Sequence, residues 1–129
     1  MTMNNRLKFL RLALVVTGLT GLALYPLMLF WPSGWSWHVG HSDYPLMMVG
    51  IYATLGVFLL RAARDPLAHL SLIWFTVWSS LVHGGIMAFQ ALSGEHQMGH
   101  LMGDVPALLV AALVLAVLTP RGGAARPAT

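Results

Sequence analysis

The basic residues of this chain divide it into four long apolar runs. Short loops that carry Lys and Arg stay on the cytoplasmic side of a membrane. No Lys or Arg lies in the two remaining gaps between the runs. The pattern therefore predicts an all-α membrane protein, a bundle of four transmembrane helices with both termini in the cytoplasm. The seven bases lie before or at the start of the first run (Arg6, Lys8, Arg11), between the second and third (Arg61, Arg64), and after the fourth (Arg121, Arg126).

Each apolar run is long enough to cross a bilayer, because a helix needs about 20 apolar residues to span about 30 Å of hydrocarbon. Residues 1–129 form one membrane domain in this interpretation. Pro26 predicts a kink around Leu22 to Tyr25. Pro106 predicts a bend in the last helix, which would be short for a span if it began only at Asp104. The expected helices cover residues 9–31, 43–60, 67–92 and 100–118, and a disordered tail rich in Gly, Ala and Pro covers about 119–129.

The start of the chain also has the basic and apolar segments of a signal peptide. Its apolar stretch is longer than the roughly 7–15 residues usual for such a segment, and no small-residue cleavage site follows it. We therefore expect a retained helix.

Composition agrees with a membrane location and excludes several classes of protein. Hydrophobic residues make up 57% of the chain and charged residues only 9%, against about 25% charged in soluble domains. The net charge of +3 is explained by topology, and no basic patch with interleaved aromatics suggests nucleic acid. The absence of cysteine excludes disulfides and thiolate chemistry. The expected partners are the lipid bilayer and a second copy of the chain or a larger membrane complex.

Small residues spaced four apart mark the faces on which the helices would pack. Helix contacts in lipid depend on such residues, because apolar burial drives association weakly there. We expect these sets to form the internal seams of the bundle, or in one case a dimer face. They are Thr17 and Gly21, Gly50 and Thr54, Ser80 with Gly84 and Ala88, and Ala107 and Ala111.

Histidines and acids gather on the side opposite the bases. His96, His100 and Asp104 would share one face if their segment is helical, and His41 belongs to the other outer loop. Two imidazoles one turn apart and a carboxylate can hold a transition metal. These four residues are the candidate metal ligands. Against this interpretation, the glycines at positions 99 and 103 weaken a helix, and Asp104 could serve only as a helix cap.

His83 is the candidate residue for binding a cofactor or ligand. It lies within the third predicted helix, roughly 10–14 Å from its outer end. An ionisable group at such a depth marks a functional site by default. The alternative is a neutral imidazole bonded to a hydroxyl group, for which Tyr52, Thr54 and Ser79 are available. Haem is disfavoured because no second histidine lies at depth, and transport is disfavoured because no relay of ionisable groups accompanies His83.

Several segments resemble an uncharacterised family of small bacterial four-helix inner-membrane proteins, over about residues 9–121. The resemblance implies a class and a location, and no activity. The hairpin at Ala63-Arg64-Asp65-Pro66 is loosely similar to DoxX-like membrane proteins and implies no residue role. The segments that carry the family resemblance are Tyr25-Pro26-Leu27-Met28, Trp31-Pro32-Ser33-Gly34-Trp35, Gly50 to Leu60, Trp74-Phe75 and Gly99-His100-Leu101-Met102-Gly103-Asp104-Val105-Pro106-Ala107.

Three functional hypotheses follow from the sequence. The leading one is a non-catalytic protein of the bacterial cytoplasmic membrane that binds a metal ion or small ligand at its outer, periplasmic rim, or acts as an accessory subunit. The main rival is a small membrane enzyme or redox component that uses His83 with Asp104 or His100. The third is a structural scaffold without a site. The sequence identifies no catalytic residue, substrate or metal.

Overall fold

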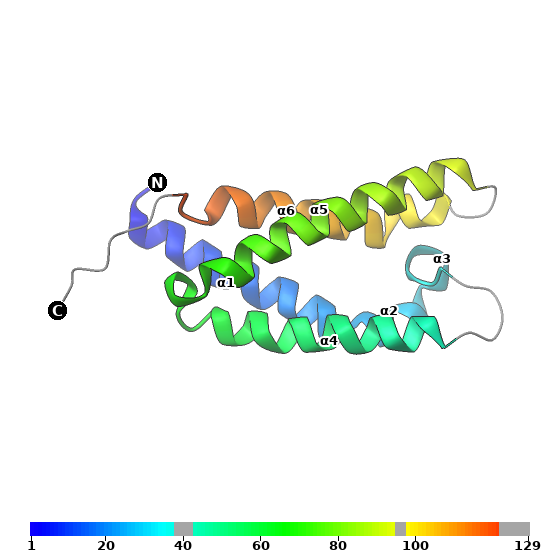
Figure 1. The fold of residues 1–129 in the computed structure, drawn as a ribbon, viewed down its shortest axis with the longest axis horizontal. Helices are drawn as coiled ribbons and strands as arrows, with labels where there is room; N and C mark the ends of the chain where they lie inside the picture. Colours follow the sequence, from blue (N-terminus) through cyan, green and yellow to red (C-terminus); the bar gives the residue numbers. More distant parts are fainter. Residues whose placement is uncertain (38–42, 95–97, 122–129) are drawn as a thin grey trace.

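The computed structural model describes residues 1–37, 43–94 and 98–121. Every regular element in these ranges is a helix (Figure 1). The elements are α1 (Met3–Leu22), α2 (Leu24–Phe30), α3 (Pro32–Trp35), α4 (Tyr44–Ala62), the 3₁₀ turn η1 (Pro66–His69), α5 (Leu70–Ser93), the 3₁₀ turn η2 (Met98–Met102) and α6 (Asp104–Leu118).

Three helical stretches of the described chain are long and apolar enough to cross a membrane, which indicates a membrane protein. They are Tyr44–Ala62, Pro66–Ser93 and Met98–Leu118. Helices α1 and α2 together are also long and apolar enough to cross a membrane, although they are bent by 59°. They would form a fourth crossing if they count as one span. The all-helical class expected from the sequence is therefore confirmed.

The bend between α1 and α2 falls at Ala23, within the turn where Pro26 was expected to kink the helix. Proline cannot donate to the carbonyl of the residue four positions earlier, and its ring crowds that carbonyl. The helix therefore breaks one turn before Pro26.

Two outer segments differ from the sequence-based expectation. Part of the expected first outer loop folds as the short helix α3, with Pro32 in its first turn. The expected α-helix from His100 onward is instead the 3₁₀ turn η2, followed by a break at Gly103. Pro106 lies in the first turn of α6, three residues after the break at Gly103, which is the spacing between Ala23 and Pro26. The break therefore falls in the turn before the proline, as it does at Pro26.

The helices form two pairs that meet closely at one end of the molecule. Helix α1 packs along α4, and α5 packs along α6, while α1 also contacts α6 (Figure 1). A buried cluster joins the four helices near the termini: Leu10 and Leu14 of α1, Leu59 of α4, Ile73 and Val77 of α5, and Leu115 of α6. Helices α4 and α5 contact each other much less, so the two pairs diverge away from this end.

Close backbone contact holds α1 against α4. A Cβ atom on Gly56 would lie 2.5 Å from the carbonyl oxygen of Gly18, and one on Gly21 would lie 2.7 Å from that of Tyr52. The expected seam at Gly21 is therefore present. The expected seam at Gly50 is wrong, because this residue is exposed and a Cβ there would meet nothing within 4 Å.

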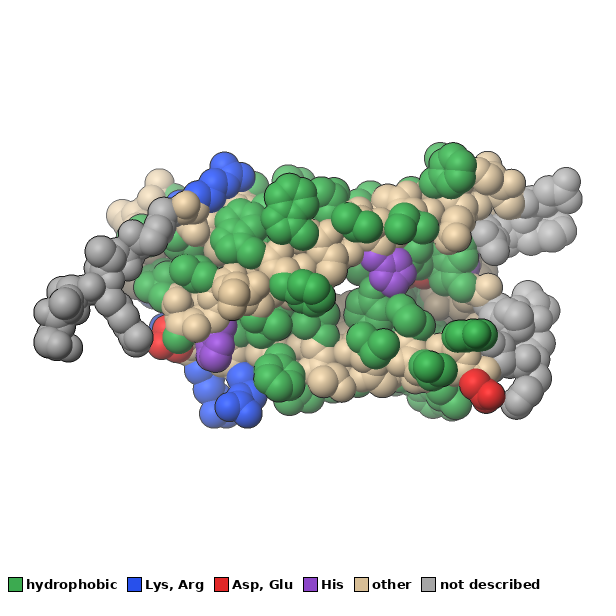
Figure 2. All heavy atoms as spheres, in the orientation of Figure 1, with side chains coloured by type: hydrophobic (Ala, Val, Ile, Leu, Met, Phe, Trp, Pro, Cys, Tyr) green, Lys and Arg blue, Asp and Glu red, His purple; other side chains and the backbone are tan. Residues whose placement is uncertain are grey.

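The basic side chains gather at the end of the molecule that carries the N-terminus (Figure 2). Arg6 has a structural role there that the sequence did not reveal. Its guanidinium donates hydrogen bonds to the backbone carbonyl oxygens of Leu118 at 2.9 Å, Val117 at 2.8 Å and Thr119 at 3.1 Å. Arg6 therefore satisfies carbonyls at the C-terminal end of α6, which have no partner within the helix.

Candidate functional site

At the end of the molecule remote from the termini, α3 contacts η2 (Figure 1). The backbones approach so closely that a Cβ atom on Gly99 would collide with the carbonyl oxygen of Ser33, and one on Gly103 with that of Gly34. Glycine is required at such approaches because any side chain would force the segments apart. Two segments that are remote in the sequence are thereby locked together, and we call this contact the outer cap.

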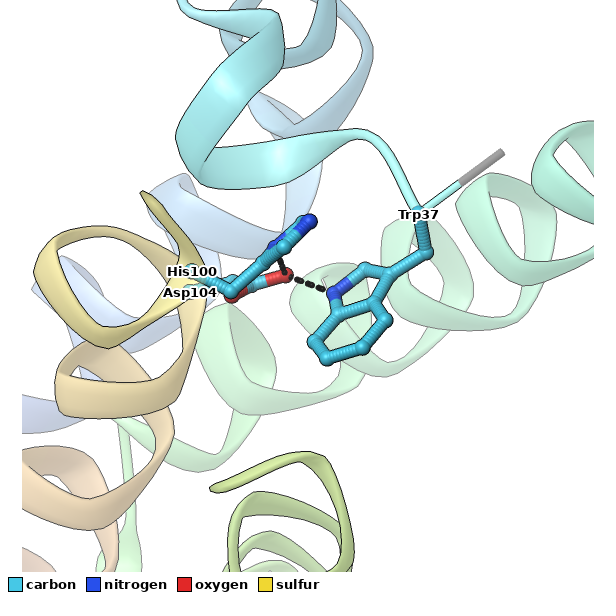
Figure 3. A network of polar contacts seen from close by, with 3 residues as sticks. All are labelled: Trp37, His100 and Asp104. Atoms are coloured by element: carbon cyan, nitrogen blue, oxygen red, sulfur yellow. Dashed lines mark hydrogen bonds and ion pairs between the residues drawn. The ribbon is translucent and has the colours of Figure 1, made fainter. Parts of the chain in front are cut away.

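A polar cluster lies beside the outer cap (Figure 3). Trp37 donates its indole N–H to Oδ2 of Asp104 at 2.5 Å. Nδ1 of His100 lies 3.0 Å from Oδ1 and 3.1 Å from Oδ2 of the same carboxyl group. The rings of Trp37 and His100 are stacked, with centroids 3.9 Å apart. Asp104 and His100 are only 6% and 3% exposed, so the cluster is shielded from solvent.

A second polar pair joins α4 to α5. The hydroxyl of Tyr52 lies 2.5 Å from Nδ1 of His83. The expected hydrogen bond of His83 to a neighbouring helix is therefore confirmed, with Tyr52 as the partner. The other two hydroxyl groups considered as partners of His83 form hydrogen bonds within their own helices. Thr54 donates to the carbonyl of Gly50, and Ser79 donates to the carbonyl of Thr76.

Both polar groups line one large cavity between the helix pairs. Its volume is about 930 Å³, within the range of about 300–1,000 Å³ typical of small-molecule sites. Tyr52, His83 and Asp104 all line the cavity, so α4, α5 and α6 each contribute a polar group to its wall. Apolar side chains from all four long helices form most of the remaining wall, including Val16, Leu55, Met87 and Val110. The arrangement suits a molecule with a long apolar body and a small polar group.

The structure brings together two of the four candidate metal ligands. His100 and Asp104 are bonded to each other, whereas His41 and His96 lie outside the described residues. No group of three or more His, Asp or Glu residues suited to a metal occurs within the described ranges. The four-residue metal site therefore stays a prediction.

The sequence did not identify Trp37 as a functional partner. A tryptophan in such a segment is typical of the membrane interface, and the indole of Trp37 instead donates to the carboxyl group of Asp104. No local pattern signals such a contact, since the two residues are 67 positions apart. One weak signal was present in the sequence. Both the Trp-rich segment 31–37 and the segment 99–104 were expected on the side opposite the basic residues, so they could lie near each other.

Comparison with known proteins gives a family but no activity. A family model described as a family of unknown function (DUF6632) matches residues 4–129. No curated protein matches the chain, and no solved structure does. The match agrees with the expected membership of a family without an assigned activity. Because the model covers nearly the whole sequence, the chain belongs to this family of unknown function, DUF6632.

Proposed function

We propose that this protein binds a small amphiphilic molecule inside the membrane, in the cavity between its two helix pairs. The single observation that carries the proposal is a cavity of about 930 Å³ whose largely apolar wall includes the polar side chains of Tyr52, His83 and Asp104. Polar groups at membrane depth are costly unless they serve binding or packing. A ligand with one polar group and an apolar body would contact both kinds of wall.

The proposal includes a location and an orientation. The protein belongs to a bacterial cytoplasmic membrane, with the basic end and both termini in the cytoplasm and the outer cap facing the periplasm. The clustering of Lys and Arg at one end supports this orientation.

Filling the cavity tests the proposed function. Ala111 lines the cavity on α6, and Phe at this position would occupy space that a ligand needs. We expect wild-type protein in lipid nanodiscs to retain an organic molecule in stoichiometric amount, detected by native mass spectrometry, and Ala111→Phe to lose it.

The matched control is Leu113→Phe on the same helix, where the side chain is 65% exposed on the outer surface of the bundle. This variant should keep the ligand. Identical spectra for wild type and Ala111→Phe, with both folded, would contradict ligand binding in the cavity and favour the scaffold hypothesis.

Metal binding at the outer rim is a second proposal, which one observation favours. The carboxyl group of Asp104 bonds to Nδ1 of His100 at 3.0 Å. A carboxylate in this position orients an imidazole for metal binding through the opposite nitrogen. His100 would then be a ligand, together with His41 and His96, and Asp104 would position it. Elemental analysis of the purified protein beside a His96→Ala/His100→Ala variant tests this set.

A further inference from the structure

The hydrogen bond between Tyr52 and His83 links the direction of donation to the nitrogen that carries the imidazole proton. A phenolic hydroxyl is a stronger donor than a neutral imidazole N–H, and an imidazole nitrogen is a stronger acceptor than a phenolic oxygen, so donation from Tyr52 to Nδ1 of His83 is the favoured arrangement. A hydroxyl that donates to Nδ1 requires this nitrogen to be unprotonated. The neutral imidazole then carries its proton on Nε2. His83 therefore has an N–H donor that is not used in its hydrogen bond with Tyr52.

This donor has no acceptor in the described part of the chain. His83 lies in the span Pro66–Ser93 and lines the cavity. No described residue accepts a hydrogen bond from its Nε2. An N–H group without a partner is costly in a hydrocarbon environment, because water is not available to replace the missing bond. The cavity wall therefore offers this donor to an occupant. The indole N–H of Trp35, another lining residue, is a second donor without a partner in the described part of the chain.

The charges on the wall argue against an ionic occupant. None of the described residues that line the cavity is Lys or Arg, so an anionic head group would find no fixed positive charge. Asp104 is the acid among them, and its carboxyl group already accepts from Trp37 and pairs with His100. A cationic head group would have to compete with both partners. An uncharged head group avoids both costs.

From these contacts we propose that the occupant is an uncharged amphiphile with a carbonyl oxygen that accepts a hydrogen bond from Nε2 of His83. The inference rests on the proposed function and specifies the ligand class of the same site. Quinones and glycerol esters share this chemistry. The carbonyl would lie beside the Tyr52–His83 pair, and the apolar body would extend along the cavity wall.

A set of photoreactive probes with one common tail tests the head-group chemistry. Each probe carries the same diazirine-bearing alkyl chain, ending in a methyl ester, a carboxylate, a trimethylammonium group or no polar group. Full-length protein in nanodiscs is labelled at increasing mole fractions of each probe. We expect saturable labelling of the cavity by the ester at a mole fraction about tenfold lower than by the other three. The alkane and ammonium probes have no acceptor for Nε2 of His83, and the carboxylate would be buried without a positive charge beside it.

Two variants of His83 separate its hydrogen bond from its bulk. His83→Phe keeps a ring without a donor, and we expect it to raise half-saturation by the ester about tenfold. His83→Gln restores an N–H donor and should stay within about threefold of wild type. His69→Phe is the control, since this histidine lies in η1, before the start of α5, and is not among the described residues that line the cavity. Unchanged ester labelling in folded His83→Phe would overturn the proposal, as would equal labelling by the ionic probes.

Competition distinguishes the two sources of a carbonyl group. Displacement of the ester probe by decylbenzoquinone or by a monoacylglycerol would support the proposal and name the source. Displacement by the alkane alone would overturn it. Failure of the proposed function has a different signature, because Ala111→Phe would then leave the labelling by every probe unchanged.

Discussion

At the scale of single residues, the carboxyl group of Asp104 is held by donors from two distant parts of the chain. Trp37 comes from the segment after α3, and His100 comes from η2 (Figure 3). A buried carboxyl group without hydrogen bonds costs several kcal/mol, so each donor contributes to holding the outer cap beside α6. The cluster therefore has a structural role whether or not a ligand is bound.

Removal of the Trp37 donor should destabilise the fold. Trp37→Phe keeps an aromatic ring to stack on His100 and loses the N–H group that bonds to Asp104. We expect the free energy of unfolding, measured in mixed detergent micelles, to fall by about 1–3 kcal/mol. The control is Trp78→Phe on the exposed face of α5, where the side chain is 61% exposed. Equal losses in the two variants would show that the bond to Asp104 contributes nothing.

The sequence identified some of these residues through their individual chemistry. His83, His100 and Asp104 were recognisable because ionisable side chains near or within a membrane span are costly and seldom incidental. Tyr52 was one of three hydroxyl groups near His83, and only the three-dimensional arrangement selects it. Trp37 was not recognisable, because a tryptophan in an outer loop fits the membrane interface equally well.

At the scale of elements, the pairing of α1 with α4 depends on glycines that permit backbone contact. The sequence suggested small residues four apart, yet it could not determine which face of α4 turns inward. Helix α4 is apolar on every side, so its hydrophobic pattern does not distinguish the lipid-facing surface from the buried one. For this reason Gly50 was assigned to a seam in place of Gly56.

Two alanine substitutions in α4 should have opposite effects. Gly56→Ala would place a Cβ 2.5 Å from the carbonyl oxygen of Gly18 and should cost about 1–3 kcal/mol of unfolding free energy. Gly50→Ala meets nothing within 4 Å and should gain up to about 1 kcal/mol from helix propensity. Chemical denaturation of both variants in micelles measures the difference. A neutral Gly56→Ala would mean that α1 and α4 are not in backbone contact.

The helix breaks show which element boundaries a sequence can reveal. Pro26 located the bend at Ala23 because proline acts on the backbone directly. Gly103 gave a weaker signal, since glycine permits a break without requiring one. The short helix α3 depends on its contact with η2, and such a long-range contact has no local signature.

At the scale of the whole molecule, Arg6 ties the first helix to the end of the last. The basic residues were expected to determine the orientation of the protein in the membrane. Arg6 is different because it donates to three consecutive carbonyl oxygens, from Val117 to Thr119. Hydrogen bonds from a charged group are stronger than those between neutral groups.

The loss of this contact should loosen the end of the bundle. We expect Arg6→Ala to lower the free energy of unfolding by about 1–3 kcal/mol and to expose the end of α6 to protease. Lys8→Ala removes a charge from the same turn of α1 without removing such bonds, and it should have little effect. Matching protease patterns in the two variants would indicate that Arg6 acts only through its charge.

The divergence of the helix pairs bears on how a molecule could reach the cavity. Helices α4 and α5 contact each other little and both line the cavity, so its lateral side lies between them and faces the surrounding lipid. An occupant would then enter sideways from the bilayer. Its effective concentration would be its mole fraction among the lipids, and a compound almost insoluble in water would still find the site by diffusion within the plane of the membrane.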